Sequence, residues 1–232
     1  MIVPVRRKRG GTYAGAGDVL DHDETVRLDG PWTTRTPRDA AARFADYGGQ
    51  WWIAGGWAID AFAGSSREHG DLDVGIPRGT VGGFVAFASR LLDVWAADGS
   101  LTPLLDGGES SLSEECGNLW LRASGADPWE YDVLLEQVHG DRWTFKRDPR
   151  ITRPLSDCLW EEQQLRFLRP EVQLLLKAEN ARAKDSFDRE RCLPLLDEAD
   201  LAWLEQSHRT AHPGHSWVER IDRARRSATP MA

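Results

Sequence analysis

Two aspartates carry the chemistry that the sequence most directly supports. Asp71 and Asp73 lie in Asp71–Ile76, which alternates polar and apolar residues like a half-buried strand. Side chains at i and i+2 share one face of a strand, so both carboxylates are expected to point together while Leu72 and Val74 enter the core. Adjacent carboxylates repel each other unless a cation lies between them, and Mg²⁺ prefers one or two carboxylates plus substrate phosphates. The alternative is an exposed strand edge with solvated aspartates.

Two glycines precede these aspartates at a spacing that suits a phosphate site. Gln50–Ala54 is a short apolar run that predicts a buried strand, and Trp57–Ala63 predicts a helix that ends at Gly64. Between them, Gly55 and Gly56 let the backbone turn sharply and leave no Cβ to hold a ligand away. The amides that open a helix can point at an anion, aided by the helix dipole. A glycine pair alone is weak evidence, but together with the aspartate pair it favours a site for a nucleoside triphosphate and a divalent metal.

The same segment carries a set of residues at fixed spacings that resembles a known signature. These residues are Gly55, Gly56, Trp57, Asp60, Gly64, Arg67, His69, Asp71 and Asp73. The chain resembles the DNA polymerase β-like nucleotidyltransferase superfamily, and within it the branch of aminoglycoside 2″-adenylyltransferases and lincosamide nucleotidyltransferases. The resemblance runs from about Trp51 to about Trp217 and is strongest in its first third and in Pro170–Pro194.

The resemblance implies roles for individual residues. Gly55 and Gly56 are expected to contact the triphosphate, and His69 is expected to belong to the same nucleotide site. Asp71 and Asp73 are expected to bind Mg²⁺. The implied donor is ATP, and the implied reaction transfers a nucleoside monophosphate to a hydroxyl group.

A third carboxylate lies inside the strand pattern Trp129–Glu136. Burying an unpaired carboxylate is costly, so Asp132 should have a cation or a hydrogen-bond partner. By the family resemblance, Asp132 either completes the metal site or accepts the proton of the substrate hydroxyl; the alternative is a structural salt bridge to an arginine. Glu136 has the same strand parity and is the second candidate for the base or a substrate-binding acid near the rim, and Glu130 is a weaker one.

Two lysines in the C-terminal part are candidates for the nucleotide site. Pro170–Lys177 predicts the start of a helix, and Lys177 and Lys184 are seven residues apart, so they would share a face if the helix continued. Asp188 would then lie on that face too. The family resemblance favours Lys177 as the lysine that reaches the triphosphate, with Lys184 second. An ordinary solvated face with a Lys184–Asp188 pair is the alternative.

Two further groups of ionisable side chains have structural interpretations. His208 and His212 have i, i+4 spacing, but Pro213 and Gly214 break the helix after them, so these histidines and His215 are expected at the surface. Three arginines precede the helical part and are expected to anchor the linker rather than touch phosphate: Arg147, Arg150 and Arg153.

Composition limits the class of protein. The chain has 232 residues and a net charge of -8, and no apolar stretch is long enough to span a bilayer. Its acidic balance argues against a general nucleic-acid binder and suits a cationic small substrate, although such a charge also simply keeps a protein soluble. The three cysteines are odd in number and widely spaced, as in a reducing cytoplasm: Cys116, Cys158 and Cys192.

The predicted fold class is α+β. A mobile tail is expected over residues 1–17, a nucleotidyltransferase-like α/β domain with a mixed sheet and flanking helices over 18–169, and a helical subdomain over 170–232. In the α/β part, helices are expected over 36–47 and 82–92, and strands over 119–121, 129–135 and 142–145.

The sequence thus favours a cytoplasmic, Mg²⁺-dependent adenylyltransferase, monomeric or homodimeric, that modifies a hydroxyl of a small molecule. An aminoglycoside or lincosamide antibiotic is the preferred acceptor. Two alternatives remain. In the first, the acceptor is a protein or tRNA, and only the basic tail favours this. In the second, the chain is a non-catalytic nucleotide-binding module.

Overall fold

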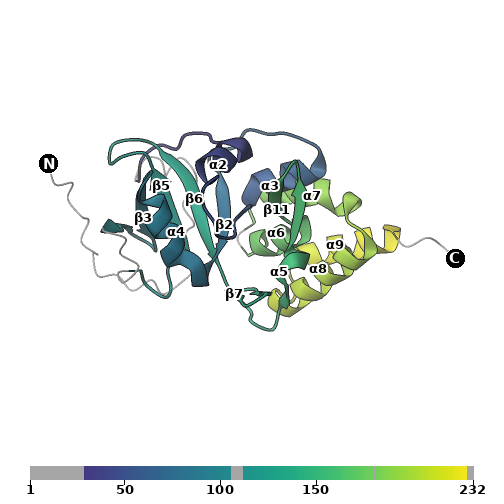
Figure 1. Cartoon of the computed structure of the whole chain (residues 1–232). Coiled ribbons are helices and arrows are strands. Elements are labelled where there is room, and N and C mark those ends of the chain that lie inside the picture. Colours follow the sequence, from purple (N-terminus) through teal and green to yellow (C-terminus); the bar gives the residue numbers. More distant parts are fainter. Residues whose placement is uncertain (1–28, 106–111, 180, 229–232) are drawn as a thin grey trace.

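The computed structural model describes residues 29–105, 112–179 and 181–228, and these form a mixed sheet with helices packed against it (Figure 1). The predicted α+β class is confirmed, including the mixed sheet and the C-terminal helical part. Residues 1–17 lie outside the described residues, so the predicted tail stays a prediction. The division into domains at residue 169 also stays a prediction, although a helix does begin at Pro170.

The larger sheet has the strand order β10-β11-β1-β2-β6-β5-β3-β4, and a smaller sheet has the order β7-β8-β9. The strands of the larger sheet are β1 (Trp52–Ile53), β2 (Asp73–Pro77), β3 (Asp93–Ala97), β4 (Leu101–Pro103), β5 (Asn118–Arg122), β6 (Trp129–Glu136), β10 (Leu159–Glu162) and β11 (Leu165–Leu168). The strands of the smaller sheet are β7 (Val138–His139), β8 (Arg142–Thr144) and β9 (Thr152–Pro154). In the larger sheet, β2 runs parallel to β6 and β1 runs parallel to β11, whereas the other pairs are antiparallel.

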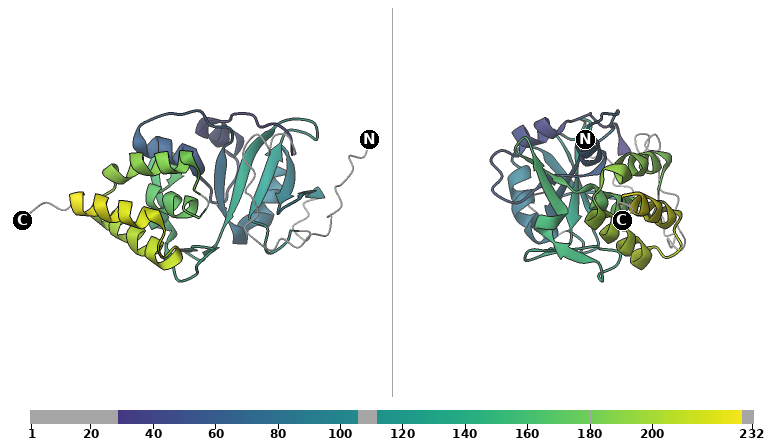
Figure 2. Two further views of the ribbon diagram at one scale, coloured as in Figure 1. Left: turned by 180° about the vertical axis from the view of Figure 1, so that it is seen from behind. Right: turned by 90° about the vertical axis from the view of Figure 1, so that its right-hand side faces the viewer.

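Helices cover the sheet and continue beyond it. The α-helices named here are α2 (Pro37–Arg43), α3 (Gly55–Ala63), α4 (Val81–Ala88), α5 (Leu155–Cys158), α6 (Pro170–Lys177), α7 (Ala183–Cys192), α8 (Glu198–Ala211) and α9 (Ser216–Ala228). Short 3₁₀ segments are η1 (Arg78–Thr80) and η4 (Leu193–Leu195). Figure 2 shows α6 to α9 gathered at one end of the molecule, with β3 to β5 at the other.

Local sequence explains where several helices begin and end. Thr36 caps α2 and accepts a hydrogen bond from the Asp39 amide, while the Asp39 carboxylate accepts one from the Thr36 amide, which completes a capping box. The helix expected after Pro170 does not continue to Asp188. It ends at Lys177, and α7 starts anew at Ala183. The prediction of one shared helix face for Lys177 and Lys184 was therefore wrong.

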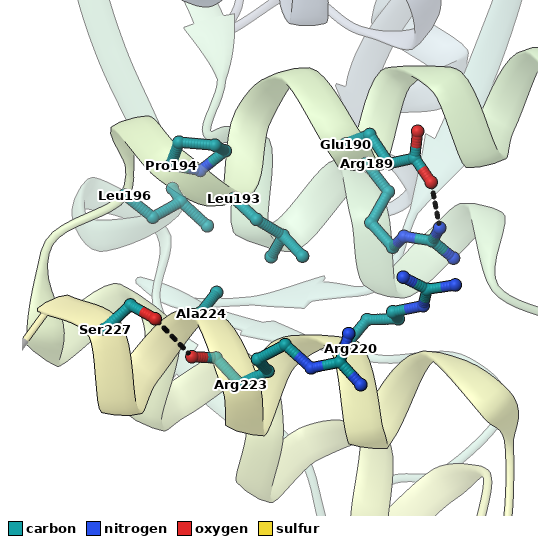
Figure 3. Close-up of a pocket in the computed structure, with 9 residues that line it drawn as sticks. All are labelled: Arg189, Glu190, Leu193, Pro194, Leu196, Arg220, Arg223, Ala224 and Ser227. Carbon is teal, nitrogen blue, oxygen red and sulfur yellow. Dashed lines mark hydrogen bonds and ion pairs between the residues drawn. The ribbon is translucent and has the colours of Figure 1, made fainter.

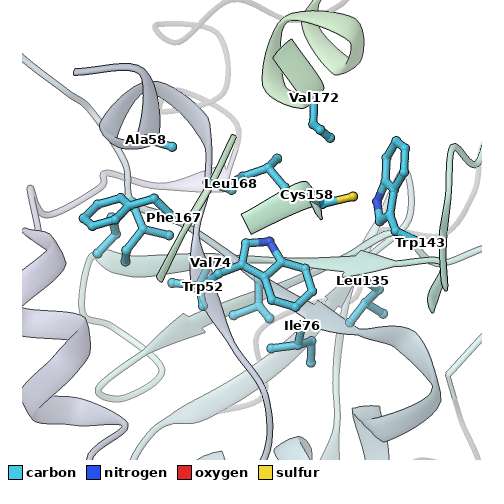
Figure 4. Packing of buried hydrophobic residues seen from close by; sticks show 14 of the residues in the cluster. Trp52, Ala58, Val74, Ile76, Leu135, Trp143, Cys158, Phe167, Leu168 and Val172 are labelled. Atoms are coloured by element: carbon cyan, nitrogen blue, oxygen red, sulfur yellow. The ribbon is translucent and has the colours of Figure 1, made fainter. Parts of the chain in front are cut away.

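Apolar residues from the sheet and from both sets of helices form one core. Figure 4 shows Trp52 of β1 packed among strand side chains, with Ala58 of α3 and Val172 of α6 above them. All three of these side chains are fully buried. The helical part therefore packs directly on the strand and helix that flank the glycine pair, so elements far apart in sequence share one core.

Candidate active site

Asp132 lies beside the first pair of aspartates because β2 and β6 are adjacent parallel strands. Asp73 opens β2, and its register partner in β6 is Asp132. The Asp132 amide donates a hydrogen bond to the Leu72 carbonyl at 3.0 Å, which fixes this register. Leu72 is fully buried and Asp71 is half-buried, as the alternation predicted, although the strand begins only at Asp73. The structure thus brings Asp71, Asp73 and Asp132 together.

The electrostatics of this group are unfavourable in the absence of a cation. Burial, followed by the charge of Asp71, raises the pKa of Asp73 to about 7. Burial, followed by the charge of Asp73, raises the pKa of Asp132 well above its usual value. Each charged carboxylate disfavours ionisation of the next. A bound cation would remove this repulsion.

The glycine pair forms the first turn of α3, and Gly55 lies against the Asp73 carboxylate. Gly55 has a φ of 62°, and any Cβ there would collide with the Asp73 carboxylate. A Cβ at Gly56 would meet the Arg67 and His69 side chains instead. The Gly55 amide donates to the Gln173 Oε1 atom at 2.7 Å, so α6 already occupies one of the donors that open the helix. The amides of the next residues have no partner within the helix, which leaves them able to bind an anion.

His69 is buried behind the glycine pair, 4% exposed. Its Nε2 atom lies 2.8 Å from Asp60 Oδ2, and its ring stacks on Trp57 with centroids 4.4 Å apart. Asp60 also accepts from the Arg67 amide at 2.9 Å and from Arg191 at 3.1 Å. Burial is the largest cause of the lowered pKa of His69. The contacts of His69 therefore fit a residue that positions the glycine turn, and direct nucleotide contact stays a prediction.

The two candidate lysines differ in their surroundings. Lys177 is 10% exposed and forms ion pairs with Asp185 at 2.7 Å and Asp188 at 3.1 Å. Asp188 also lies 3.5 Å from Arg67, so the alternative with a Lys184–Asp188 pair is not what forms. Lys184 is exposed as a residue, but partial desolvation of its ammonium group and then the charge of Arg182 lower its pKa, while Asp71 raises it.

Both lysines lie within electrostatic range of the carboxylate group. The charges of Lys177, Lys184 and Arg182 all lower the pKa of Asp73. Lys177 is already held by two carboxylates, whereas Lys184 has no ion pair among the described residues. The structure therefore favours Lys184 over Lys177 as the lysine that can turn to a phosphate group.

The remaining acidic candidates do not join the site. Glu136 is paired with Pro77 at the far end of β6, and its carboxylate accepts a hydrogen bond from Trp143 Nε1 at 2.8 Å. Four residues of strand separate it from Asp132, which is about 13 Å. Glu130 is buried and bound to Arg35 at 2.9 Å. Glu136 as the base or a rim acid is therefore not supported by its position.

The three linker arginines each hold an acidic partner, as expected for anchoring. Arg147 pairs with Glu179, Arg150 with Asp148, and Arg153 with Glu171, at 2.5, 2.5 and 2.8 Å respectively.

The expectation of surface histidines was wrong for His208, whereas His212 and His215 are partly exposed. His208 is fully buried, because it lies on the face of α8 that packs on α9 and its Nδ1 atom is bonded to the Leu204 carbonyl at 3.1 Å. Its ring centroid is 6.0 Å from that of His212 and 6.3 Å from that of His215. Burial lowers the pKa of His208 to about 4.

Sequence reasoning missed two residues that contact the site. Asn118 of β5 donates to Asp132 Oδ1 at 2.8 Å, and Gln173 of α6 binds the Gly55 amide. Asn118 begins a segment in which polar and apolar residues alternate as in a strand. The only signal for its role in the sequence is that it is polar and begins such a strand. The Gln173 contact joins residues 118 positions apart, which no local pattern encodes.

Within the described ranges, no group of three or more His, Cys, Asp or Glu side chains is arranged to hold a metal ion unaided. The two pockets described in the structure, of about 410 and 350 Å³, do not include the carboxylate group among their lining residues.

Residues 38–85 match the sequence profile of the aminoglycoside-2″-adenylyltransferase family. The predicted family resemblance is confirmed. The match includes the glycine pair and the first two aspartates and ends before Asp132, whose place in the site rests on strand register alone. It supports an enzyme of the adenylyltransferase class.

The structure is similar to solved structures at low sequence identity, and three of them are described here. A lincomycin-bound lincosamide antibiotic adenylyltransferase, LnuA, is 16% identical, with a TM-score of 0.47 over 69% of this chain and 96% of its own. ANT(2″)-Ia in complex with adenylyl-2″-tobramycin is 17% identical, with a TM-score of 0.46 over 72% and 91%. The solution structure of ANT(2″)-Ia is 17% identical, with a TM-score of 0.48 over 78% and 92%.

No curated protein sequence matches the chain. Among the described residues, none of the helices has the length and apolar character needed to cross a membrane.

Proposed function

We propose that the protein is a Mg²⁺-dependent nucleotidyltransferase that moves AMP from ATP onto a hydroxyl of a small molecule. The observation that carries the proposal is the register of β2 on β6, which places Asp132 beside Asp73 next to the glycine turn. Asp73 and Asp132 lie on two adjacent strands, Asp71 lies just before β2, and the start of α3 lies against Asp73. Carboxylates that can hold a metal beside a helix start that can bind phosphate suit nucleotidyl transfer.

The residues present fit Mg²⁺. Asp71, Asp73 and Asp132 would hold it, since burial and then their mutual repulsion raise the pKa of Asp73 and Asp132, and a bound cation relieves both. Mg²⁺ commonly takes one or two carboxylates and completes its shell with water and substrate phosphates. The protein would therefore supply only some of the ligands of the ion, and water and the triphosphate would supply the others. When bound, the ion would neutralise charge on the triphosphate and lower the pKa of the attacking hydroxyl.

The donor is proposed to lie between the start of α3 and the start of α7. The amides after Gly55 face one side of this region, and Lys184 and Arg182 supply positive charge from the other. Helix amides and flexible ammonium groups both bind phosphate oxygens well. His69 supports the turn from behind through Asp60.

Asp132 is proposed either to help hold the metal or to accept the proton of the acceptor hydroxyl. In the second role, the hydroxyl oxygen bonds to the α-phosphorus, the bond to the leaving pyrophosphate breaks, and the proton passes to Asp132. A raised pKa brings a carboxylate closer to the working pH of a general base. Asn118 holds Oδ1 and so fixes the orientation of the carboxylate.

An aminoglycoside or lincosamide antibiotic is the proposed acceptor, and inactivation of the antibiotic is the proposed outcome. The family match over residues 38–85 supports this class, and the net charge of -8 suits a cationic substrate. All three cysteines are free and buried, which suits the cytoplasm, where such antibiotics act.

Pyrophosphate release tests the proposal. The protein is incubated with ATP, Mg²⁺ and a panel of aminoglycosides and lincosamides, and Asp71→Asn should abolish the release that any of them elicits. Asp46→Asn, at an exposed turn outside the site, is the matched control and should behave like the wild type. Unchanged release in Asp71→Asn would refute the metal assignment. Transfer of AMP onto protein or tRNA, with no small molecule accepted, would refute the acceptor class.

A further inference from the structure

A second pocket lies between α7 with η4 on one side and α9 on the other, away from the carboxylate group (Figure 3). Its volume is about 410 Å³, within the range of about 300–1,000 Å³ that is usual for small-molecule sites. Its lining residues are Arg189, Glu190, Leu193, Pro194, Leu196, Arg220, Arg223, Ala224 and Ser227. None of the residues assigned to the nucleotide or the metal belongs to this set.

The pocket is strongly cationic. Among its lining residues in the described part of the chain, three are arginines and one, Glu190, is an acid. Figure 3 shows the side chains of Arg189 and Arg220 extending toward each other across the gap between the helices. Within the described part of the chain, Arg220 and Arg223 form no ion pair. Guanidinium groups that face each other without an acid between them repel unless an anion joins them.

The surroundings of Arg189 are a second observation that points to an anion. It is only 6% exposed, and its guanidinium lies over the Trp217 ring, 4.9 Å from the centroid. Among the residues that the structure describes, its acidic contact is with Glu190 at 3.1 Å, whose side chain is 64% exposed and therefore stabilises it weakly. The Arg189 Nε atom is buried and has no hydrogen-bond partner among these residues. A buried charged donor without an acceptor is costly, and buried polar groups normally find one.

We propose that this pocket binds a small phosphorylated molecule. Its phosphate group lies between Arg189 and Arg220, and its apolar part packs on Leu193, Leu196 and Ala224. The three arginines less Glu190 leave a charge of about +2, which matches a phosphate monoester of about -1.5 to -2 at neutral pH. Planar guanidinium groups also bind phosphate oxygens in pairs, so two of them can clamp one group. This site is independent of the proposed transferase reaction.

Calorimetric titration of the full chain with phenyl phosphate, without nucleotide or Mg²⁺, tests the proposal. One saturable site is expected, and benzoate of the same ring size should bind more weakly because it carries a single charge. Arg220→Gln should weaken phenyl phosphate binding by about tenfold or more, since one charged hydrogen-bond donor is lost. Arg220 is exposed, so the variant should fold, and the unfolding transition checks this.

Two variants separate this site from others. Arg226→Gln lies on the same helix and outside the pocket, and it should bind phenyl phosphate like the wild type. Lys184→Gln removes a cation from the proposed nucleotide site and should also leave this binding unchanged. The proposal is overturned if no saturable binding occurs, if benzoate binds as tightly, or if binding is lost in Lys184→Gln and kept in Arg220→Gln.

Discussion

Asp73 and Asp185 both lie within range of Lys177, yet their electrostatics are opposite. Burial and the neighbouring Asp71 raise the pKa of Asp73 to about 7. Burial acts on Asp185 too, but Lys177 and Arg182 outweigh it and lower the pKa of that carboxyl. Asp73 therefore lies against other acids, whereas Asp185 lies against cations. The pairing of Asp185 stabilises the fold, whereas the repulsion at Asp73 costs stability, which a bound cation would relieve.

The largest expected effect is on activity, and it distinguishes Asp73, an acid of the proposed site, from Glu136, an acid outside it. Asp73→Asn should lower AMP transfer by about a thousandfold or more, because a charge that holds the metal and orients the triphosphate is lost. Glu136→Gln should stay close to wild type, since Glu136 contacts Trp143 at the far end of β6. Initial rates of pyrophosphate release measure both. Equal losses in the two variants would remove the distinction between site and scaffold.

Stability should respond in the helical part instead. Lys177→Met leaves Asp185 and Asp188 buried without their shared cation, which should reduce the free energy of unfolding by about 3–5 kcal/mol. Urea unfolding measures this. Arg226→Gln breaks an exposed pair with Asp222 and should cost less than about 0.5 kcal/mol. A small effect of Lys177→Met would show that Lys177 is not a structural counter-ion. Its earlier assignment to the nucleotide site would then be favoured again.

Asn118 tests whether the orientation of Asp132 matters. Asn118→Ala removes the hydrogen bond to Asp132 Oδ1 and should reduce kcat by about 10- to 100-fold, as other supporting partners of catalytic groups do. Asn118→Asp places a fourth carboxylate beside the group and should be worse. Because a purely structural role would lower stability without changing kcat of the folded enzyme, kcat and the unfolding transition are compared for both variants.

A smaller effect is expected from the buried histidine at the other end of the helical part. His208 has a folded-state pKa of about 4 against a usual 6.5, because burial disfavours its charged form. The unfolded chain therefore binds the proton first, so this contribution to stability is full above about pH 6.5 and is lost as the pH falls toward 4. At pH 5 the loss should be about 2 kcal/mol relative to pH 7.5.

Urea unfolding at the two pH values, for the wild type and for His208→Gln, measures this loss. The variant should lose less stability on acidification than the wild type. His139→Gln, at an exposed position in β7, is the control and should lose as much as the wild type. An identical pH dependence in wild type and His208→Gln would contradict the assignment.

The parts of the site that lie close together in sequence were predictable, and the parts that depend on tertiary contacts were not. The strand, glycine turn and helix around Gly55, and the common position of Asp71 and Asp73, follow from periodicity and from glycine backbone freedom. Asp132 was identified from the cost of an ionisable group in an apolar strand and from the resemblance. Its partner, however, is set by the pairing of β2 with β6.

The errors have the same origin. Glu136 and Asp132 are four residues apart in β6, so their side chains are expected on the same face of the strand. A shared face does not bring two side chains close together along the strand. The helix expected through Lys184 stops at Lys177, and His208 becomes buried because α9 folds back on α8. Packing therefore decides which lysine has carboxylate partners, and the choice of the lysine that reaches the triphosphate stays a prediction.

The most direct test of the central claim compares the thermal unfolding of wild type and Asp73→Asn with and without Mg²⁺ and a non-hydrolysable ATP analogue. We expect the order of the two unfolding temperatures to reverse when ligand is added. Without ligand, Asp73→Asn should unfold at a higher temperature than the wild type, because one of the repelling carboxylates is gone; with ligand, only the wild type should gain substantially. A variant that is less stable without ligand, or that gains as much from Mg²⁺ and the analogue as the wild type does, would contradict the claim that these carboxylates hold a metal-bound triphosphate.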